Sequence, residues 1–330
     1  MRKHHKKKNL QKNKTNELYN FQKYLLKYLF LFFSTFLIFE IFFHIDSRLT
    51  INLNNTKNIF TFWEPSRKLP GYLKLCIKTW KKFLPEYEII IIDYNNIYYF
   101  LERKLISKIL FKKMSLPIQA DAIRVAILKK YGGIWMDADT IILNREFLKE
   151  IKGFELVMFG DHKNKTQNIG FIYATKNSSI INDWLNMIIN NVNLYKQSLM
   201  IKHYMKNINN SKLKIFRDKV NSWNFLGNGI IDPLLEKVTG PKFFRLDKYK
   251  MNIFPEIKFF ENTFLDYRTM YQKYYFQKGE PKEIINNTKG IILLHNSWTP
   301  KKYQRMTDKR FLKQDIILSK LLALTLNISI

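Results

Sequence analysis

Two aspartates separated by one alanine are the residues of this chain best suited to chemistry. Asp137-Ala138-Asp139 follows the short apolar stretch from Ile134 to Met136. In an extended segment the side chains at i and i+2 point the same way, so both carboxylates would face one site. If the strand ends at Met136, one carboxylate can bind a metal while the other reaches a ligand. Paired carboxylates hold hard divalent cations, and such a cation bridges phosphate oxygens.

A second charged pair precedes the two aspartates. Asp121 and Arg124 lie three residues apart in a segment that reads as a helix from Pro117 to Lys130, so they share one helical face. They can pair with each other as an ordinary surface ion pair, or reach one ligand together. Tyr131-Gly132-Gly133 ends this helix immediately before the strand that delivers Asp137.

The elements around these residues alternate between strands and helices, which indicates an α/β fold with a parallel sheet. Four consecutive isoleucines in the run from Glu88 to Asp93 suit a strand that is buried on both faces. Ligands bind at the carboxyl edge of such sheets, where Asp137 is expected. Further strands are expected at 58–63, 134–136, 140–143, 155–159, 170–174 and 291–294, and helices at 72–83, 179–190 and 229–237.

Composition limits the class of protein. The chain has 330 residues, of which 46% are hydrophobic and 15% aromatic, so it is not a disordered chain. Its single cysteine, Cys76, excludes an internal disulfide and a multi-cysteine zinc site. The net charge of +29 predicts attraction to anions, but no nucleic-acid-binding signature accompanies it, so no specific nucleic-acid partner is expected. Part of the charge is also what AT-rich coding would produce.

The N-terminal region predicts contact with a membrane. Residues 1–23 form a basic tail with eight Lys or Arg against one acid, Glu17. Residues 24–45 are largely apolar and are expected to form a membrane-anchor helix, because a basic tail beside an aromatic-rich segment suits an anionic cytoplasmic leaflet. No cleavage pattern of a signal peptide follows. The segment is short, and Glu40 is hard to place inside a bilayer, so an interfacial helix is the alternative to a spanning one.

The block from Ile118 to Leu143 resembles a sugar-transfer family. That family contains capsular polysaccharide synthesis proteins, initiating α-1,6-mannosyltransferases and, more distantly, clostridial glucosylating toxins. Its pattern is Ser-Asp-x-x-Arg, a helix ending in Tyr-Gly-Gly, and Asp-x-Asp, and this chain departs from the pattern at Ala120 alone. Weaker likenesses extend the resemblance over about residues 58 to 300. They involve Trp63, Cys76, Trp80, Pro85, Tyr87, Gly240, Pro241, His295, Ser297 and Trp298.

The resemblance implies a GT-A-type, Rossmann-like nucleotide-sugar-binding domain, here residues 46–310, followed by a helical tail at 311–330. It implies a hexosyltransferase that uses Mn²⁺ or Mg²⁺, retains anomeric configuration, and takes a nucleotide-diphosphate sugar as donor. A surface or capsular glycan, free or lipid-linked, would be the acceptor.

The resemblance also implies a role for each matching residue. Asp139 would ligate the metal, Asp137 would touch the ribose, the donor sugar or the metal, and His295 would complete the metal shell. Asp121 and Arg124 would hold the donor sugar. Trp63 would stack on the base of the nucleotide. Ser297 and Trp298 would contact the leaving diphosphate.

Three other readings stay open. The stretch from Trp135 to Ile141 also resembles the nucleophile motif of haloacid-dehalogenase-type phosphatases, in which Asp137 would attack phosphorus and Asp139 would serve as acid and base. The charge alone would suit a basic membrane-tethered nucleic-acid binder. A family member without turnover is the third. As to location, a bacterial chain is expected to keep its catalytic domain on the cytoplasmic side of the membrane, and a eukaryotic one in the Golgi lumen.

Overall fold

The structure of the protein is a computed structural model. The structure describes residues 24, 26–35, 57–161, 166–176, 178–204, 222, 224–239, 245–246, 251–255, 274–282, 284, 290–294 and 296–329. The chain divides into two units, Met1–Asn54 and Asn55–Ile330, which are described separately.

In the first unit the structure describes one helical segment at residues 24 and 26–35. Its large apolar side chains are exposed, with Phe30 at 77% and Phe32 and Phe33 each at 65%. Residues 36–45, the second half of the predicted anchor, lie outside the described residues. Among the residues described, no helix combines the length and the apolar character that crossing a membrane requires.

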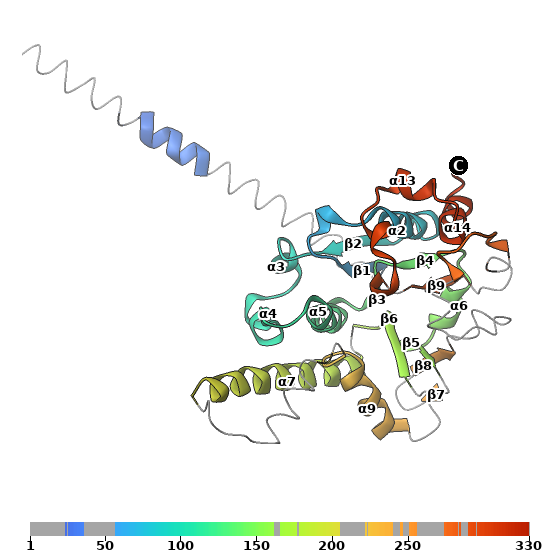
Figure 1. The fold of residues 1–330 in the computed structure, drawn as a ribbon. Coiled ribbons are helices and arrows are strands. Elements are labelled where there is room, and N and C mark those ends of the chain that lie inside the picture. The colour runs from blue at the N-terminus through green and yellow to red at the C-terminus, as the bar shows by residue number, and fades with distance from the viewer. Residues whose placement is uncertain are drawn as a thin grey trace, which may run out of the picture. The chain divides into compact units, whose positions relative to one another are not determined.

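The second unit is built on a mixed sheet of seven strands in the order β2-β1-β3-β6-β5-β8-β7, with a smaller sheet of β4 and β9 beside it (Figure 1). β1 pairs in parallel with both β2 and β3, whereas β6 runs antiparallel to β3 and to β5. The predicted α/β class is therefore confirmed, although the sheet is mixed. The strands are β1 (Asn58–Phe62), β2 (Glu88–Ile92), β3 (Gly133–Met136), β4 (Thr140–Ile142), β5 (Leu156–Asp161), β6 (Thr166–Ala174), β7 (Arg245–Leu246), β8 (Met251–Pro255) and β9 (Ile291–Leu293).

Helices cover the sheet and follow the strands in sequence. The described ones are η1 (Ser66–Lys68), α2 (Gly71–Phe83), α3 (Ile97–Phe100), α4 (Arg103–Ile109), α5 (Leu116–Tyr131), α6 (Phe147–Ile151), α7 (Ser179–Tyr204), α9 (Asn228–Thr239), η5 (Asn296–Trp298), α12 (Lys301–Gln304), α13 (Asp308–Leu312) and α14 (Ile317–Leu326). The helix expected at 179–190 thus continues to Tyr204.

Alternation along β3 decides which helix each side chain meets. Ile134 and Met136 pack in the core cluster that contains α2, whereas Trp135 lies under the guanidinium of Arg124 on α5, at 5.3 Å from its carbon Cζ. The sheet is therefore covered by α2 on one face and by α5 on the other. Each face needs its own set of apolar residues, and this explains why the strand has no polar side.

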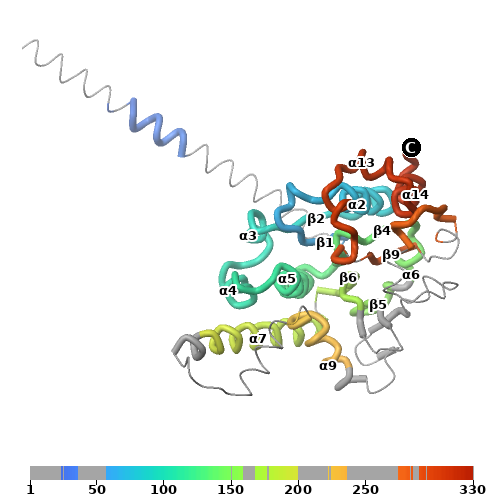
Figure 2. The backbone as a smooth tube through the Cα atoms, viewed as in Figure 1, coloured from blue at the N-terminus to red at the C-terminus, as the bar shows by residue number. Residues whose placement is uncertain are grey.

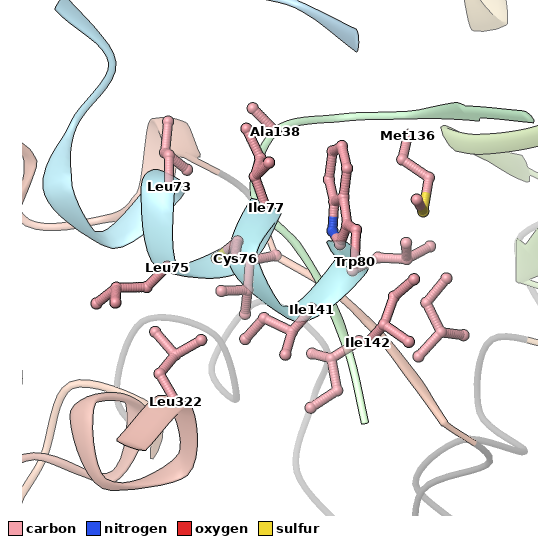
Figure 3. Packing of buried hydrophobic residues seen from close by; sticks show 14 of the residues in the cluster. Leu73, Leu75, Cys76, Ile77, Trp80, Met136, Ala138, Ile141, Ile142 and Leu322 are labelled. Carbon is pink, nitrogen blue, oxygen red and sulfur yellow. The ribbon is translucent and has the colours of Figure 1, made fainter. Parts of the chain in front are cut away.

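The core on the α2 face includes the end of the chain. Figure 3 shows side chains of α2 facing Met136 and the residues of β4, with Leu322 of α14 below them. Trp80 is fully buried and its indole Nε1 donates to the carbonyl of Thr140 at 2.7 Å. The segment predicted as a C-terminal helical tail thus contains α14, whose apolar side packs on α2. Figure 2 shows the two helices next to each other.

One prediction about burial is wrong. The isoleucine-rich β2 is the edge strand of the large sheet, so it is not buried on both faces. Glu88 is exposed and Ile89 to Ile91 are half-buried, with full burial only at Ile92. The isoleucine-rich strand pairs with one neighbour only, β1, and the layer that covers the sheet is incomplete at this edge.

Candidate active site

Three parallel strands end at the same edge, and that edge carries the candidate site. The register places Phe60 opposite Trp135, so Trp63 lies one residue beyond the level of Asp137. Phe62 pairs with Ile92, which puts Asp93 beside Trp63 at the end of the next strand. In α/β proteins, ligands bind at the carboxyl ends of parallel strands.

Tyr131-Gly132-Gly133 brings the acidic pair to this edge. Tyr131 stacks on Phe60 of β1 with ring centroids 5.8 Å apart. Gly132 has a φ of 67°, and its N–H closes the helix on the carbonyl of Leu128 at 2.8 Å. A Cβ on Gly133 would lie 2.8 Å from the carbonyl oxygen of Asn58, so only glycine lets β3 begin this close to β1.

Asp137, Ala138 and Asp139 form a turn and not an extended segment. β3 ends at Met136, and the N–H of Thr140 donates to the carbonyl of Asp137 at 2.9 Å. The reading in which both carboxylates point the same way from a strand is therefore wrong, because the strand stops before them. The other reading, in which they reach different partners, describes the geometry.

Asp137 belongs to a buried network centred on Arg124. Its Oδ1 accepts from Arg124 Nη2 and from Trp135 Nε1, both at 2.9 Å. Arg124 Nη1 donates to the carbonyl of Ile169 at 2.7 Å and lies 3.4 Å from Asp121 Oδ1. Asp121 and Arg124 are 5% and 3% exposed, so the predicted pair forms, but inside the protein and not on its surface.

Asp139 turns toward the C-terminal part of the chain. Its Oδ2 accepts from the backbone N–H of Asn296 at 2.5 Å. The side-chain oxygen of Asn296 accepts from the hydroxyl of Tyr72 on α2, and its carbonyl accepts from Gln304 Nε2 at 2.9 Å. The loop that contains the predicted residue Ser297 is thereby fixed directly against the buried carboxylate.

Burial raises the pKa of two of the three carboxylates, and the charge of Asp137 adds to both shifts. Burial raises the pKa of Asp139 to about 8, and the charge of Asp137 adds to the effect. Burial likewise raises the pKa of Asp121 to about 7; Arg124 opposes this shift and Asp137 adds to it. Among the described residues, Arg124 is the one basic side chain that forms an ion pair with any of these three aspartates. When all three carboxylates are ionised, the site would therefore carry more negative than positive charge.

This donor set fits a hard divalent cation. Asp137 is 40% exposed at its side chain, and its Oδ2 accepts no hydrogen bond from any described residue. Asp139 is a buried carboxylate within electrostatic reach of Asp137. A cation between them would offset the burial that raises the pKa of Asp139 and the repulsion from Asp137 that adds to the shift. Within the part of the chain that the structure describes, no three His, Cys, Asp or Glu side chains form a complete metal site. His295, the predicted third ligand, lies outside the described residues.

The residues predicted to contact the nucleotide have different exposures. Trp63 and Trp298 are half-buried and pack against the core cluster of the α2 face, whereas Ser297 is exposed. Trp63 is fixed by its backbone N–H, which donates to the carbonyl of Ile92 at 3.0 Å. Ser297 and Trp298 directly follow Asn296, whose backbone N–H binds Asp139, while Trp63 shares only the strand edge with the aspartates.

Comparison with known families agrees with the motif. Residues 4–224 match the family model of capsular polysaccharide synthesis proteins, about two thirds of the chain. The chain belongs to the capsular polysaccharide synthesis protein family. This match covers the Asp121–Asp139 block, and it confirms the resemblance found in the sequence. No curated protein sequence matches the chain.

Two solved structures are similar to this family member. One is the PaToxG glycosyltransferase, with 18% identity, coverage of 60% of this chain and 79% of that chain, and a TM-score of 0.31. The other is an active-site mutant of LgtC, with 12% identity, coverage of 75% of this chain and 93% of that chain, and a TM-score of 0.32. Both likenesses concern the course of the backbone alone.

The structure of this family member adds residues that the sequence reasoning missed. Tyr72, Asn296 and Gln304 hold the loop beside Asp139, as described above. Gly227 presses on the acidic network, since a Cβ there would lie 2.5 Å from Asp121 Oδ2. Gly170 is similar, with a Cβ position 3.2 Å from Asp137 Oδ2. The position of Asn296 directly before Ser297 and Trp298 was the one signal available, because contacts this distant in sequence leave no local pattern.

Proposed function

We propose that this protein transfers a hexose from a nucleotide-diphosphate sugar to a free or lipid-linked glycan during capsular polysaccharide synthesis, within a GT-A-type domain. Family membership supports the pathway. The observation that carries the proposed chemistry is the placement of Asp137 and Asp139 at the carboxyl edge of β1 and β3, beside a buried arginine. A metal-diphosphate site needs oxygen ligands at such an edge.

Asp139 and Asp137 would hold Mn²⁺ or Mg²⁺, with His295 as the third ligand. When bound, the cation supplies charge stabilisation to the departing diphosphate. The two Nη groups of Arg124 already contact Asp137, Asp121 and the carbonyl of Ile169, so we assign Arg124 to positioning Asp137. Asp121, which is buried against Arg124, would hold the donor-sugar side of the site through the same network.

The loop at η5 would bind the leaving group. Ser297 is exposed and Trp298 half-buried beside the anchored Asn296, which suits contacts to the diphosphate. Trp63, half-buried at the end of β1, would stack on the base. Donors aimed at the departing phosphate stabilise the charge that develops as the sugar becomes oxocarbenium-like. No residue of the motif is an obvious general base, which supports retention with the phosphate itself taking the acceptor proton.

We further propose that the N-terminal region brings the enzyme to a membrane. Its support is the run of exposed apolar side chains at 26–33 after a tail rich in Lys and Arg. A basic and aromatic helix of this kind binds an anionic leaflet. For a bacterial chain we propose a catalytic domain on the cytoplasmic side, where nucleotide sugars are made.

A donor panel tests the function. The full chain with Mn²⁺ is incubated with UDP-sugars and GDP-sugars, and release of nucleotide diphosphate is measured. We expect hydrolysis or transfer with one donor, and a loss of about 10³-fold or more in Asp139→Asn, because a site without its ligand loses the charge stabilisation. The matched control is Asp183→Asn, at an exposed aspartate of α7, which should keep full turnover.

Two outcomes would contradict the proposal. Turnover of a generic phosphomonoester without turnover of any donor would favour the phosphatase reading, in which Asp137 is the nucleophile. Equal activity of Asp139→Asn and Asp183→Asn would remove the acidic pair from the mechanism. Thermal unfolding of each variant shows whether an activity loss follows from misfolding.

A further inference from the structure

The chain between β2 and α5 carries a basic and aromatic face on the catalytic unit. We call it the α3–α4 surface, and its exposed residues are Tyr98, Tyr99, Lys104, Lys108, Lys112 and Lys113. Tyr98 and Tyr99 are 53% and 44% exposed, although α3 buries its other two side chains, Ile97 and Phe100. Large aromatic side chains left in water on a helix that has a core-facing side need a reason.

Positive charge concentrates on this surface. Residues 97–116 hold five Lys or Arg against one acid, Glu102, which is about twice the charge density of the whole chain. None of the four lysines forms an ion pair with any described residue, so their charges are available to a partner. If these lysines only reflected the high lysine content of the whole chain, they would be spread evenly along it. Instead they are concentrated in the segment that carries the exposed tyrosines.

Contacts within the surface hold its parts together. Arg103 lies over the ring of Tyr98 at 5.3 Å from the centroid, which joins α3 to α4. Lys104 and Lys108 are one turn apart on α4 and project from the same side. Lys196 of α7 donates to the carbonyl of Ser107 at 2.6 Å and fixes the far end of α4. The lysines therefore stand on a supported element of the fold.

The α3–α4 surface is close to the candidate site. α3 begins five residues after β2 ends, at the same strand edge that bears Asp137. Tyr94, between them, donates from its hydroxyl to Gln119 Oε1 on α5 at 2.8 Å. Leu116, 44% exposed at the start of α5, precedes Asp121 by five residues, or about 7 to 8 Å along the helix axis.

We propose that the α3–α4 surface docks the catalytic unit on an anionic lipid bilayer, independently of the N-terminal helix. Lysines reach acidic headgroups, and tyrosines sit at the level of the headgroups with their rings toward the acyl chains. A nucleic acid would use the lysines but gives no role to Leu116. Docking at this face would bring the strand edge of the active site near the membrane, where a lipid-linked acceptor is held.

Vesicle binding of the full chain tests the proposal. The patch variant carries Lys→Gln at 104, 108, 112 and 113, and the matched control carries Lys→Gln at four exposed lysines elsewhere, Lys81, Lys301, Lys309 and Lys313. With vesicles of phosphatidylcholine and 30% phosphatidylglycerol, we expect binding of the patch variant to weaken by roughly tenfold or more relative to the control, since each lysine near the surface contributes. Tyr98→Ser with Tyr99→Ser should lower the binding that survives in 0.5 M salt.

Lysine footprinting separates this surface from the N-terminal helix. Acetylation of the wild-type chain is followed by mass spectrometry with and without vesicles. We expect protection of the four patch lysines by at least about threefold and none at the control lysines, however tightly the N-terminus binds. Equal labelling with and without vesicles, or equal vesicle binding of patch and control variants, would overturn the proposal. The proposal would also be overturned if the patch variant lost binding to a single-stranded RNA oligonucleotide but bound vesicles as well as the control variant.

The test is independent of the proposed catalysis. Vesicle binding and footprinting need no donor, so they stand even if no nucleotide sugar is turned over. Conversely, the patch variant should hydrolyse the donor in detergent solution as fast as wild type, because none of its four positions lies in the acidic network.

Discussion

Arg124 shows how much one side chain arranges in this site. Its guanidinium reaches two aspartates, a backbone carbonyl and the face of Trp135. A lysine could not replace it, because a single ammonium group cannot serve acceptors that diverge in this way. The spacing of Asp121 and Arg124 predicted their pairing. Their burial, and the sharing of Arg124 with Asp137, depend on packing of α5 against β1 and β3, which no short sequence motif encodes.

Gly227 should be intolerant of even a methyl group. It is buried in the turn before α9, and a Cβ would lie 2.5 Å from Asp121 Oδ2 and 2.6 Å from Ile169 Cδ1. Gly227→Ala should displace Asp121 and disturb the carbonyl of Ile169 that Arg124 binds. We expect turnover to fall by roughly 10²-fold, as for a displacement of about 1 Å in a catalytic network. Steady-state donor hydrolysis measures this.

Gly229→Ala is the control for Gly227→Ala. Its Cβ would meet the carbonyl of Asn224 in the same turn but no carboxylate. A loss confined to Gly227→Ala shows that the effect passes through Asp121. Equal losses in both variants would mean that the turn as a whole, and not the contact with Asp121, is what matters.

Among the elements, α2 does most to place Asp139. Trp80 donates to Thr140 just after the acidic pair, Thr79 Oγ1 accepts from the N–H of Ile142 at 2.9 Å, and Tyr72 donates to Asn296. The extents of α2, α5 and β3 were predictable from their apolar spacing, Pro117 and the two glycines. The contact between α2 and the loop of Asn296 was not, because 224 residues separate Tyr72 from Asn296.

Tyr72→Phe should loosen the loop without unfolding the protein. The ring still packs on Phe311, with centroids 5.7 Å apart, but Asn296 loses its donor. We expect a loss of about 1 kcal/mol in the free energy of unfolding, typical of one hydrogen bond. Turnover should fall by about tenfold, because Asn296 also fixes Asp139.

The matched variant for Tyr72→Phe is Tyr275→Phe, which removes a hydroxyl from another fully buried tyrosine of the same core cluster. Thermal unfolding and donor hydrolysis are measured for both. If Tyr275→Phe lowers turnover as much as Tyr72→Phe, the loop contact has no special part in catalysis.

For the whole molecule, the buried aspartates make stability depend on pH. Asp121 and Asp139 have pKa values of about 7 and about 8 in the folded protein, against about 3.9 in an unfolded chain. Between pH 4 and 8 the folded state therefore binds more protons than the unfolded state. Stability of the metal-free protein must fall as pH rises through this window.

Thermal unfolding in the presence of a chelator measures this effect. From pH 5.5 to pH 8.5 we expect Tm to fall on the order of 5 °C, and Mn²⁺ to raise it again at pH 8.5, where the carboxylates are charged. Asp93 and Asp308, whose pKa values are lowered chiefly by hydrogen bonds, lose their contribution only in more acidic solution. Asp139→Asn should flatten the pH dependence. A wild-type Tm that rises over the same pH window would contradict the raised pKa values of the buried carboxylates.

The anchoring of Asp139 by Asn296 also orders the events of synthesis. The aspartates, α2 and α5 leave the ribosome well before residue 296, and α14 covers α2 only after residue 326 has been made. Until then, the carboxylate of Asp139 lacks its backbone donor, and part of the apolar surface of α2 has no cover. The nascent protein therefore cannot acquire a finished catalytic centre before residue 296 has been made.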